Sequence, residues 1–484
     1  MQNKLFHARE NLDVLIHGIG FNDEICQIIN KYKEKLLSRK EFENMATLEI
    51  NNDPKNLFEK NNINTEKKAF KRYYNAGLLD NIDEDFLNKV QTYWRTNYKK
   101  EIDPVLNLAF LNLTNNPDPR VIPSNIMWNQ LIPYFNDMNI RIGYSDKNIY
   151  DRLINTPNAP KTILKRVRGH YFDHENNELT TGEAFKEMLA HENDMIIKPS
   201  DTDNGKGIKK IYYKNNNLYL EDTPIDMKNL EERYGYNFTV QDIIKQHDIM
   251  ARPHPSSVNT LRMVTLRWKN KIRYLLTFAR FGTDNSIKDN AGTGGVCVGI
   301  TDDGEFLDFA IDEHCNVYTS HPTTNYDFKQ YAKIPNFEKY KEFVIQLHKN
   351  ILHHDFVSWD IAVGVNNEPI FIEANYRGAT WLYQMAAQRP LFGNLTEEIL
   401  EQVSNDFELG IERNVQSNLT KQNKTLKRKV KKLEAKTAKF SKINSEINKL
   451  KKENEKLAKE LHSIRNSKSW KSTAIFRNIA KKIK

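Results

Sequence analysis

One segment near the end of the chain narrows the possible folds more than any other. From Val415 to Ile464 there is no proline and no glycine, and hydrophobic residues recur at steps of four and three, with one phase break near Phe440. The stripe consists of Leu426, Val430, Leu433, Phe440, Ile443, Ile447, Leu450, Leu457, Leu461 and Ile464, with Thr437 and Asn454 in further seam positions. This repeat predicts a coiled coil over residues 412–466. It would pair with a second copy of the chain or with a partner helix; the alternative is a single charged helix in solvent.

The positive charge of the chain lies in the same region. The 484 residues carry a formal net charge of +9. From Glu412 to Lys484 there are 23 lysines and arginines, six glutamates and no aspartate, which gives +17 and leaves −8 for the rest of the chain. We therefore do not expect the body of the protein to bind nucleic acid. A basic tail suits an anionic membrane, a nucleic acid or an acidic partner.

The last segment, residues 467–484, has a different pattern. On a helical wheel four apolar residues share one face, Trp470 stands at the start, and lysines and arginines point in other directions. The apolar residues are Ile475, Phe476, Ile479 and Ile483. This pattern predicts a basic amphipathic helix that lies on an anionic membrane surface. The alternative is a tail that docks on the protein itself.

The expected cellular compartment follows from the segments and motifs that the sequence lacks. There is no apolar run long enough to span a membrane and no secretory signal pattern in the first 20 residues. The three cysteines, Cys26, Cys297 and Cys315, form no CxxC pair. Structural disulfides and zinc sites are therefore not expected, and a reducing cytoplasm fits best. Because of the basic tail, we also expect the protein to bind peripherally at the inner face of the membrane.

The rest of the chain divides into two parts. Residues 1–120 are expected to be mostly helical, because Phe21–Leu37 and Asp83–Tyr98 carry apolar residues at helical spacing. A proline-rich stretch at 116–123 marks a boundary. Residues 125–405 alternate between short apolar runs and helical stretches, which indicates an α+β unit. The expected strands are 195–198, 261–268, 272–281, 359–365 and 369–373, and the expected helices include 182–190 and 337–353.

A strand followed by a glycine-bearing loop is the first chemical signal. The run Met195–Lys198 delivers a lysine, and Gly205, Lys206 and Gly207 follow in a polar loop. Glycine lets backbone N–H groups approach phosphate oxygens, and lysine supplies positive charge. The spacing fits neither a Walker loop nor a dinucleotide-binding turn. A surface hairpin with an unrelated lysine would look the same.

Three oxygen-bearing side chains form the second signal. Asp360 lies in one apolar run, and Glu373 and Asn375 lie in the next. The last two are two residues apart on an expected strand, so they point to the same face. Carboxylates and an amide without histidine or cysteine suit magnesium rather than zinc. Ordinary ion pairs at strand ends are the alternative.

The third signal is a pair of arginine-bearing strands. Arg262 lies in the run Ser257–Thr265, and Arg280 lies in the run that precedes the glycine-rich segment Asp289–Gly295. Arginines that project from strands into a cleft are suited to holding phosphate oxygens.

The order of these three signals resembles that of the ATP-grasp superfamily. The resemblance covers about residues 125–395, and Ser257–Thr265 and Asp289–Gly299 look like its sugar-transfer-associated branch, which is found among genes for bacterial surface polysaccharides. It implies an α+β fold in which two lobes grip ATP. Here a helical N-terminal region would precede that fold, and the coiled-coil helix would follow it.

The resemblance assigns the nucleotide contacts residue by residue. Lys147 looks like the lysine that contacts the α- and β-phosphates, and Lys198 like the one near the adenine and α-phosphate. Gly205, Lys206 and Gly207 resemble the loop that covers the phosphates. The segment that would read the adenine edge with its backbone comprises Gln241, Asp242, Ile243 and Ile244.

The same resemblance assigns the magnesium ligands and the residues at the γ-phosphate and the acceptor. Asp360, Glu373 and Asn375 match the magnesium ligands. Arg262 and Arg280 are similar to the arginines at the γ-phosphate and the acceptor. After Asn375 the family often has a proline before its glycine, and Tyr376-Arg377-Gly378 departs from that pattern. The departure concerns substrate geometry more than metal binding.

The resemblance implies an ATP- and Mg²⁺-dependent carboxylate–amine ligase that forms an acylphosphate. Its substrates would be a small-molecule or glycan carboxylate, such as a sugar acid of a surface polysaccharide or capsule, and an amine. Two alternatives remain at this point. One is a kinase that phosphorylates a sugar or polyol hydroxyl, and the other is a nucleotide-binding scaffold that acts through its coiled coil.

Overall fold

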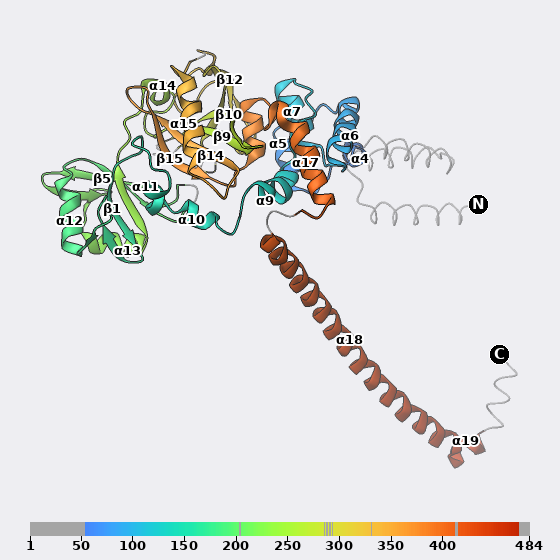
Figure 1. The fold of residues 1–484 in the computed structure, drawn as a ribbon. Helices are drawn as coiled ribbons and strands as arrows, with labels where there is room; N and C mark the ends of the chain where they lie inside the picture. Colours follow the sequence, from blue (N-terminus) through green and yellow to red (C-terminus); the bar gives the residue numbers. More distant parts are fainter. Residues whose placement is uncertain are drawn as a thin grey trace. The chain divides into compact units, whose positions relative to one another are not determined.

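The structure is a computed structural model, and it describes residues 54–202, 205–284, 286, 289, 292, 294–330, 332–411 and 415–473. The chain forms two compact units, Met1–Arg413 and Asn414–Lys484 (Figure 1). The expected helix Phe21–Leu37 and Cys26 lie outside the described residues. Cys297 and Cys315 are buried and free.

Helices make up the first described part of the chain. They are α4 (Pro54–Lys60), α5 (Lys68–Asn75), α6 (Glu84–Tyr98) and α7 (Val105–Thr114). The carboxylate of Asp83 accepts the backbone N–H of Phe86 and caps α6, and the helix ends at Lys99 in the left-handed region. The helix expected at 83–98 is confirmed. Short helices α8 (Ser124–Ile126), η1 (Met127–Leu131), α9 (Ile132–Phe135), α10 (Arg141–Ser145), η2 (Lys147–Ile149) and α11 (Tyr150–Leu153) follow.

An eight-stranded antiparallel sheet comes next in the chain, in the order β3-β2-β1-β8-β4-β5-β6-β7. Its strands are β1 (Thr162–Val167), β2 (His170–Phe172), β3 (Glu178–Leu179), β4 (Met195–Pro199), β5 (Lys209–Lys214), β6 (Asn217–Leu220), β7 (Thr223–Pro224) and β8 (Phe238–Asp242). Helices α12 (Thr181–Ala190) and α13 (Met227–Tyr234) lie beside this sheet (Figure 1). Their residues Met188 and Leu230 are buried in one core with Ile197 and Val240 of the sheet. The strand expected at 195–198 and the helix at 182–190 are confirmed.

The second sheet has seven antiparallel strands in the order β13-β12-β11-β10-β9-β14-β15. They are β9 (Thr260–Trp268), β10 (Lys271–Phe281), β11 (Val296–Ile300), β12 (Phe306–Ile311), β13 (Val317–Tyr318), β14 (Phe356–Val363) and β15 (Pro369–Asn375). Before it lies α14 (Asp248–Ala251), and between β13 and β14 lies α15 (Phe337–Lys349), four residues shorter than expected. The strands expected at 261–268, 272–281 and 369–373 are confirmed as β9, β10 and β15, and the one expected at 359–365 is β14, which begins three residues earlier and ends two residues earlier. Strands β11, β12 and β13 were not expected.

The two faces of the second sheet belong to different cores. Leu261 and Met263 face the core that contains α15. Val264 and Leu266 face α16 (Thr380–Ala387), α17 (Thr396–Glu408) and the N-terminal helices. Because side chains alternate along a strand, Arg262 shares the α16 face with Val264 and Leu266.

The N-terminal helices and α16 are joined by polar as well as apolar contacts. Buried side chains from both belong to one core. The amide of Gln384 accepts the N–H of Ile122 at 2.8 Å and donates to its carbonyl at 3.1 Å. The described N-terminal helices therefore share their packing with the second sheet.

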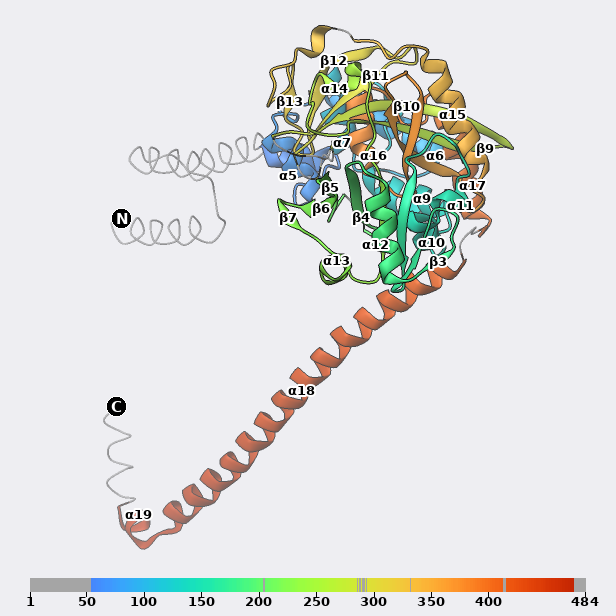
Figure 2. The same cartoon turned by 90° about the vertical axis from the view of Figure 1, so that its left-hand side faces the viewer.

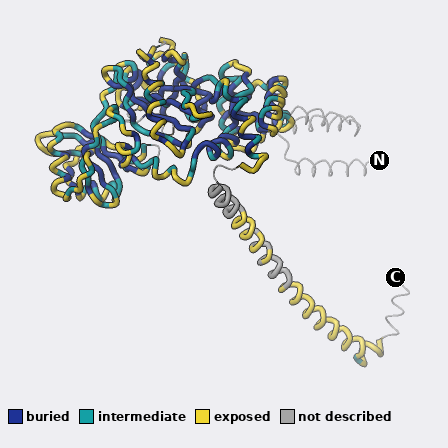
Figure 3. Tube along the Cα trace, in the orientation of Figure 1, coloured by how far each residue is buried: buried dark blue, intermediate teal, exposed yellow. Residues whose placement is uncertain are grey.

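The coiled-coil segment forms a single helix, α18 (Val415–Asn466), in both views (Figures 1 and 2). The apolar side chains of the stripe that are described are exposed along it (Figure 3). They are Leu426, Val430, Leu433, Ile447, Leu450, Leu457, Leu461 and Ile464. Pairing with a second helix stays a prediction.

A short helix, α19 (Lys468–Ser472), begins after α18, and Ser467 caps it through the N–H of Trp470. Most of the expected membrane-binding tail, from residue 474 onward, lies outside the described residues. Of the helices that are described, none combines the length and apolar character that crossing a membrane requires.

Candidate active site

Two neighbouring strands bring the three expected metal ligands together. In the antiparallel pair β14–β15, Asp360 lies opposite Glu373, and Ser358 lies opposite Asn375. The amide nitrogen of Asn375 is 3.5 Å from Oδ2 of Asp360. The strand alternation that placed Glu373 and Asn375 on one face thus brings both to Asp360.

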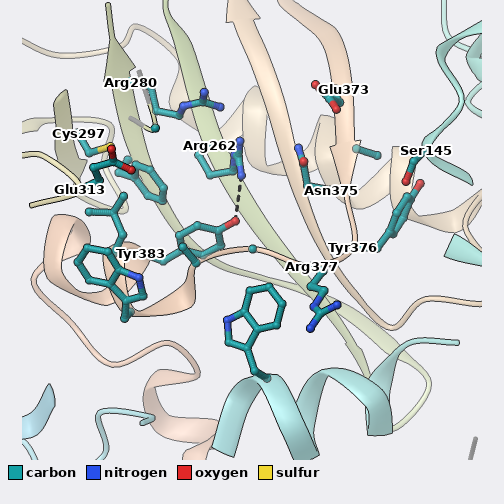
Figure 4. A pocket seen from close by; sticks show the side chains of 18 of the residues that line it. Ser145, Arg262, Arg280, Cys297, Glu313, Glu373, Asn375, Tyr376, Arg377 and Tyr383 are labelled. Carbon is teal, nitrogen blue, oxygen red and sulfur yellow. Dashed lines mark hydrogen bonds between the residues drawn. The ribbon is translucent and has the colours of Figure 1, made fainter. Parts of the chain in front are cut away.

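Both expected arginines hold Asp360. Arg262 donates from Nε to Oδ1 at 2.5 Å and from Nη2 to Oδ2 at 3.0 Å. Arg280 donates to Oδ2 at 3.0 Å and pairs with Asp289 at 3.0 Å. Figure 4 shows Arg262 and Asn375 pointing into the same space. Burial by itself would raise the pKa of Asp360, but the two guanidinium groups outweigh it and hold the pKa below its usual range.

Two buried lysines lie on the other side of Glu373. The ammonium of Lys147 is 3.7 Å from Oε1 of Glu373 and donates to the carbonyl of Thr202 at 2.7 Å. Lys198 on β4 is 7% exposed, and within the described part of the chain nothing hydrogen-bonds to its ammonium. Burial and the charge of Lys147 lower the pKa of Lys198 to about 8. A buried cation without a bonded partner suits an anionic ligand.

The carboxylates fit a magnesium ion. Burial raises the pKa of Glu373, Lys147 opposes that shift, and the facing charge of Asp360 adds to it. Two like charges opposite each other on neighbouring strands repel, so a divalent cation between them would relieve the repulsion. The donor set of two carboxylates and one amide is the oxygen chemistry that magnesium prefers.

We expect the affinity for ATP to fall as the pH rises above 8. In the ligand-free protein Lys198 loses its proton near pH 8, whereas a bound phosphate would favour the charged form and raise the pKa. Binding is therefore strongest below pH 8 and weakens by up to about tenfold per pH unit above it. Titration of a fluorescent ATP analogue between pH 7 and 10 measures this slope.

The matched control is Lys198→Arg, because arginine stays charged over the whole range. The affinity of the Lys198→Arg protein for the ATP analogue should not depend on pH above 8, whatever the absolute affinity is. An equal slope in the wild-type and Lys198→Arg proteins would assign the titration to another group.

The glycine-bearing loop joins β4 to β5. Gly207 has φ +82°, and a Cβ there would lie 2.7 Å from Cγ of Pro199, so only glycine fits. Thr202 donates to the carbonyl of Lys206, which ties the two ends of the turn together. The side chain of Lys206 is exposed. Gly205 is also in the left-handed region, with φ +63°.

The segment expected to read adenine lies at the end of β8. The side chain of Gln241 donates to Thr162, and Asp242 pairs with His191 at 2.9 Å. No backbone hydrogen bond to another described residue engages Ile243 or Ile244. The backbone of these two residues is thus available to a planar base, while the preceding side chains serve the fold.

A cavity of about 500 Å³ lies next to two of the expected metal ligands. Arg262, Arg280, Glu373 and Asn375 line it, and Lys147 and Lys198 do not. The outer wall comes from residues that the sequence did not single out: Arg72 of α5, Trp128 of η1, Arg141 of α10, and Trp381 and Tyr383 of α16. No local motif marks these residues, since they come from four separate helices.

The turn after β15 is packed tightly against Tyr383. A Cβ at Gly378 would lie 1.8 Å from the Tyr383 hydroxyl oxygen. That hydroxyl accepts from Nη1 of Arg262 at 2.9 Å (Figure 4) and lies 3.1 Å from the Ser358 hydroxyl. The absence of a side chain at Gly378 therefore lets Tyr383 support Arg262.

A comparison with models of protein families identifies the family of the chain. The model of the sugar-transfer associated ATP-grasp family matches residues 127–400. The chain belongs to this family. The α+β ATP-grasp fold expected from the sequence is thereby confirmed. No curated protein matches the sequence.

Several solved structures resemble this family member in part. The D-Ala:D-Ser ligase VanG of Enterococcus faecalis is 13% identical, with a TM-score of 0.31, over 55% of this chain and 61% of that one. A D-alanine–D-alanine ligase of Bacillus anthracis is 12% identical, with a TM-score of 0.31, over 60% and 76%. The ATP-grasp ligase PsnB, solved with a precursor peptide and AMPPNP, is 11% identical, with a TM-score of 0.31, over 56% and 62%. The chain thus spans less than two thirds of VanG.

Proposed function

We propose that this ATP-grasp protein is an ATP- and Mg²⁺-dependent carboxylate–amine ligase. One observation carries the proposal. Asp360, Glu373 and Asn375 lie together on β14 and β15, with the buried Lys147 at 3.7 Å from Glu373, and Glu373 and Asn375 line a cavity that is rich in arginine. A triphosphate held by the lysines would have its γ-phosphate at the carboxylates, next to a site for an anionic acceptor.

Each group has a role in this proposal. Lys147 and Lys198 bind the phosphates, and Asp360, Glu373 and Asn375 hold magnesium, which neutralises charge on the β- and γ-phosphates. The substrate carboxylate oxygen attacks the γ-phosphorus, and the bond to the bridging oxygen breaks and releases ADP. An amine then attacks the carbonyl of the acylphosphate, loses a proton, and expels inorganic phosphate to leave an amide.

Arg262 and Arg280 are placed to stabilise the charge of both steps. Each already donates to Asp360, and a guanidinium has five donors, so N–H groups remain for a transferring phosphoryl group. Tyr383 holds Arg262 in position from the α16 side.

The cavity favours a ligase over a kinase. Five arginines line it: Arg72, Arg141, Arg262, Arg280 and Arg377. Such a wall suits a carboxylate acceptor better than a neutral hydroxyl. We propose a sugar acid of a surface polysaccharide as the carboxylate, on the strength of the family's association with sugar transfer.

Hydroxylamine trapping tests the proposal. The protein is incubated with ATP, Mg²⁺, a panel of sugar acids and hydroxylamine, and hydroxamate and ADP are measured together. We expect equal amounts of both with the true substrate. ADP with a stable phosphoester and no hydroxamate would indicate a kinase instead, and no ADP with any acid or hydroxyl compound would favour a scaffold.

A further inference from the structure

The outer half of the cavity contains two arginines, Arg72 and Arg377, that differ from the arginines at its inner end. At the inner end, Arg262 and Arg280 are paired with Asp360 and Asp289. At the outer end no carboxylate of the described residues lies within ion-pair distance of Arg72 or Arg377. The acidic residue of this outer wall is Glu313, whose carboxylate lies 3.7 Å from His314.

Two tryptophans support these arginines. The guanidinium carbon of Arg72 lies 4.1 Å from the ring centroid of Trp381, and that of Arg377 lies 3.8 Å from the ring centroid of Trp128. Stacking uses the face of a guanidinium, whereas its N–H donors point outward in the plane. Both arginines therefore keep donors for a ligand while the rings limit their movement.

Arg72 and Arg377 line the same cavity. Two like charges at one cavity are stabilised when an anion binds between them. The wall therefore suits a negatively charged ligand, and the indole rings of Trp381 and Trp128 provide flat apolar surfaces beside it.

We propose that the outer wall binds a second anionic group of the substrate, so that the substrate is a sugar acid with a further carboxylate or phosphate. The first carboxylate lies at Arg262 and Arg280, and the second anion lies between Arg72 and Arg377. Only the role of the first carboxylate rests on the proposed ligase function. A volume of about 500 Å³ lies in the range of small-molecule sites.

Direct binding tests the inference without any turnover. Calorimetry compares glucuronic acid, which has one carboxylate, with galactaric acid, which has two, and with glucuronic acid 1-phosphate. We expect the wild-type protein to bind at least one of the two dianions about tenfold or more tightly than glucuronic acid. Whichever dianion is preferred shows whether the second group is a carboxylate or a phosphate.

The variant Arg72→Gln/Arg377→Gln should lose this preference and bind the dianions about as weakly as glucuronic acid. Arg95→Gln on α6 is the matched control, because it removes an exposed arginine that does not line the cavity. It should keep the preference. Thermal unfolding of the double variant, and its unchanged affinity for an ATP analogue, show that the fold is intact.

The outcomes separate this inference from the ligase proposal. A wild-type protein that prefers neither dianion, or a double variant that keeps the preference, overturns the inference even if hydroxamate forms. A preference that the double variant loses supports it even if no acid yields ADP, in which case the ligase proposal alone fails.

Discussion

Asp360→Asn is expected to lower the rate of ADP formation by about 1000-fold or more. The substitution removes a proposed metal ligand, and it also removes the charge that holds Arg262 and Arg280 in place. Losing a single charge-stabilising contact typically lowers a rate by about 100- to 1000-fold. Steady-state ADP release at saturating ATP, repeated over a Mg²⁺ titration, measures the loss.

The matched control for this prediction is Asp355→Asn. Asp355 pairs with Arg267, which lies five residues beyond Arg262 on β9, and neither lines the cavity. Its activity should stay within a few-fold of the wild type. An Asp360→Asn protein that keeps more than a tenth of the wild-type rate would remove Asp360 from the reaction.

Stability distinguishes Asp360 from its neighbour Glu373. The pKa of Asp360 is lowered in the folded protein, so its charge stabilises the fold above the pKa of the unfolded chain, and this contribution is lost as the pH falls. The pKa of Glu373 is raised, so its charge destabilises the fold at neutral pH. Asp360→Asn should therefore lower the free energy of unfolding, by about 3 kcal/mol, whereas Glu373→Gln should leave it unchanged or raise it while also abolishing activity.

Gly378→Ala has the second-largest expected effect. The added Cβ would lie 1.8 Å from the Tyr383 hydroxyl and 2.6 Å from its ring carbon Cζ, so Tyr383 must move. Arg262 then loses its 2.9 Å support. We expect ADP formation to fall about 100-fold, as for a misplacement of about 1 Å near the reacting atoms, and stability to fall by about 1–3 kcal/mol.

Two further variants test whether the effect of Gly378→Ala comes from the displacement of Tyr383. Gly182→Ala makes the same change in α12, where nothing lies within 4 Å of the new Cβ, and it should be neutral. Tyr383→Phe removes the hydroxyl without crowding the turn, so it isolates the loss of the bond to Arg262. If Gly378→Ala retained wild-type activity, the turn would not control the position of Arg262.

The local parts of the site could be predicted from the sequence. Side chains alternate along a strand with a period of two, so Glu373 and Asn375 were expected on the same face. Asp360 lies on the preceding apolar run, which pairs with their strand. The strand that carries Lys198 and the helix 182–190 could be predicted equally well, because short-range patterns determine them. A stripe of apolar residues without proline or glycine determined α18 in the same way.

Contacts between distant segments could not be predicted in this way. That Arg262 and Arg280 both bind Asp360 depends on the order β10-β9-β14 and on a register that no local pattern contains. The stacking of Arg72 on Trp381 joins residues more than 300 positions apart. No sequence motif in the helical N-terminal region predicts this contact.

The sequence by itself determined which side chains have the chemistry that suits phosphate and magnesium, and on which strand faces they lie, because secondary structure and alternation are set by neighbouring residues. Only the tertiary structure decided what surrounds them. The arginine and tryptophan wall forms because α5, η1 and α16 pack against one face of the second sheet, and that packing is the sum of many apolar contacts between residues far apart in the chain.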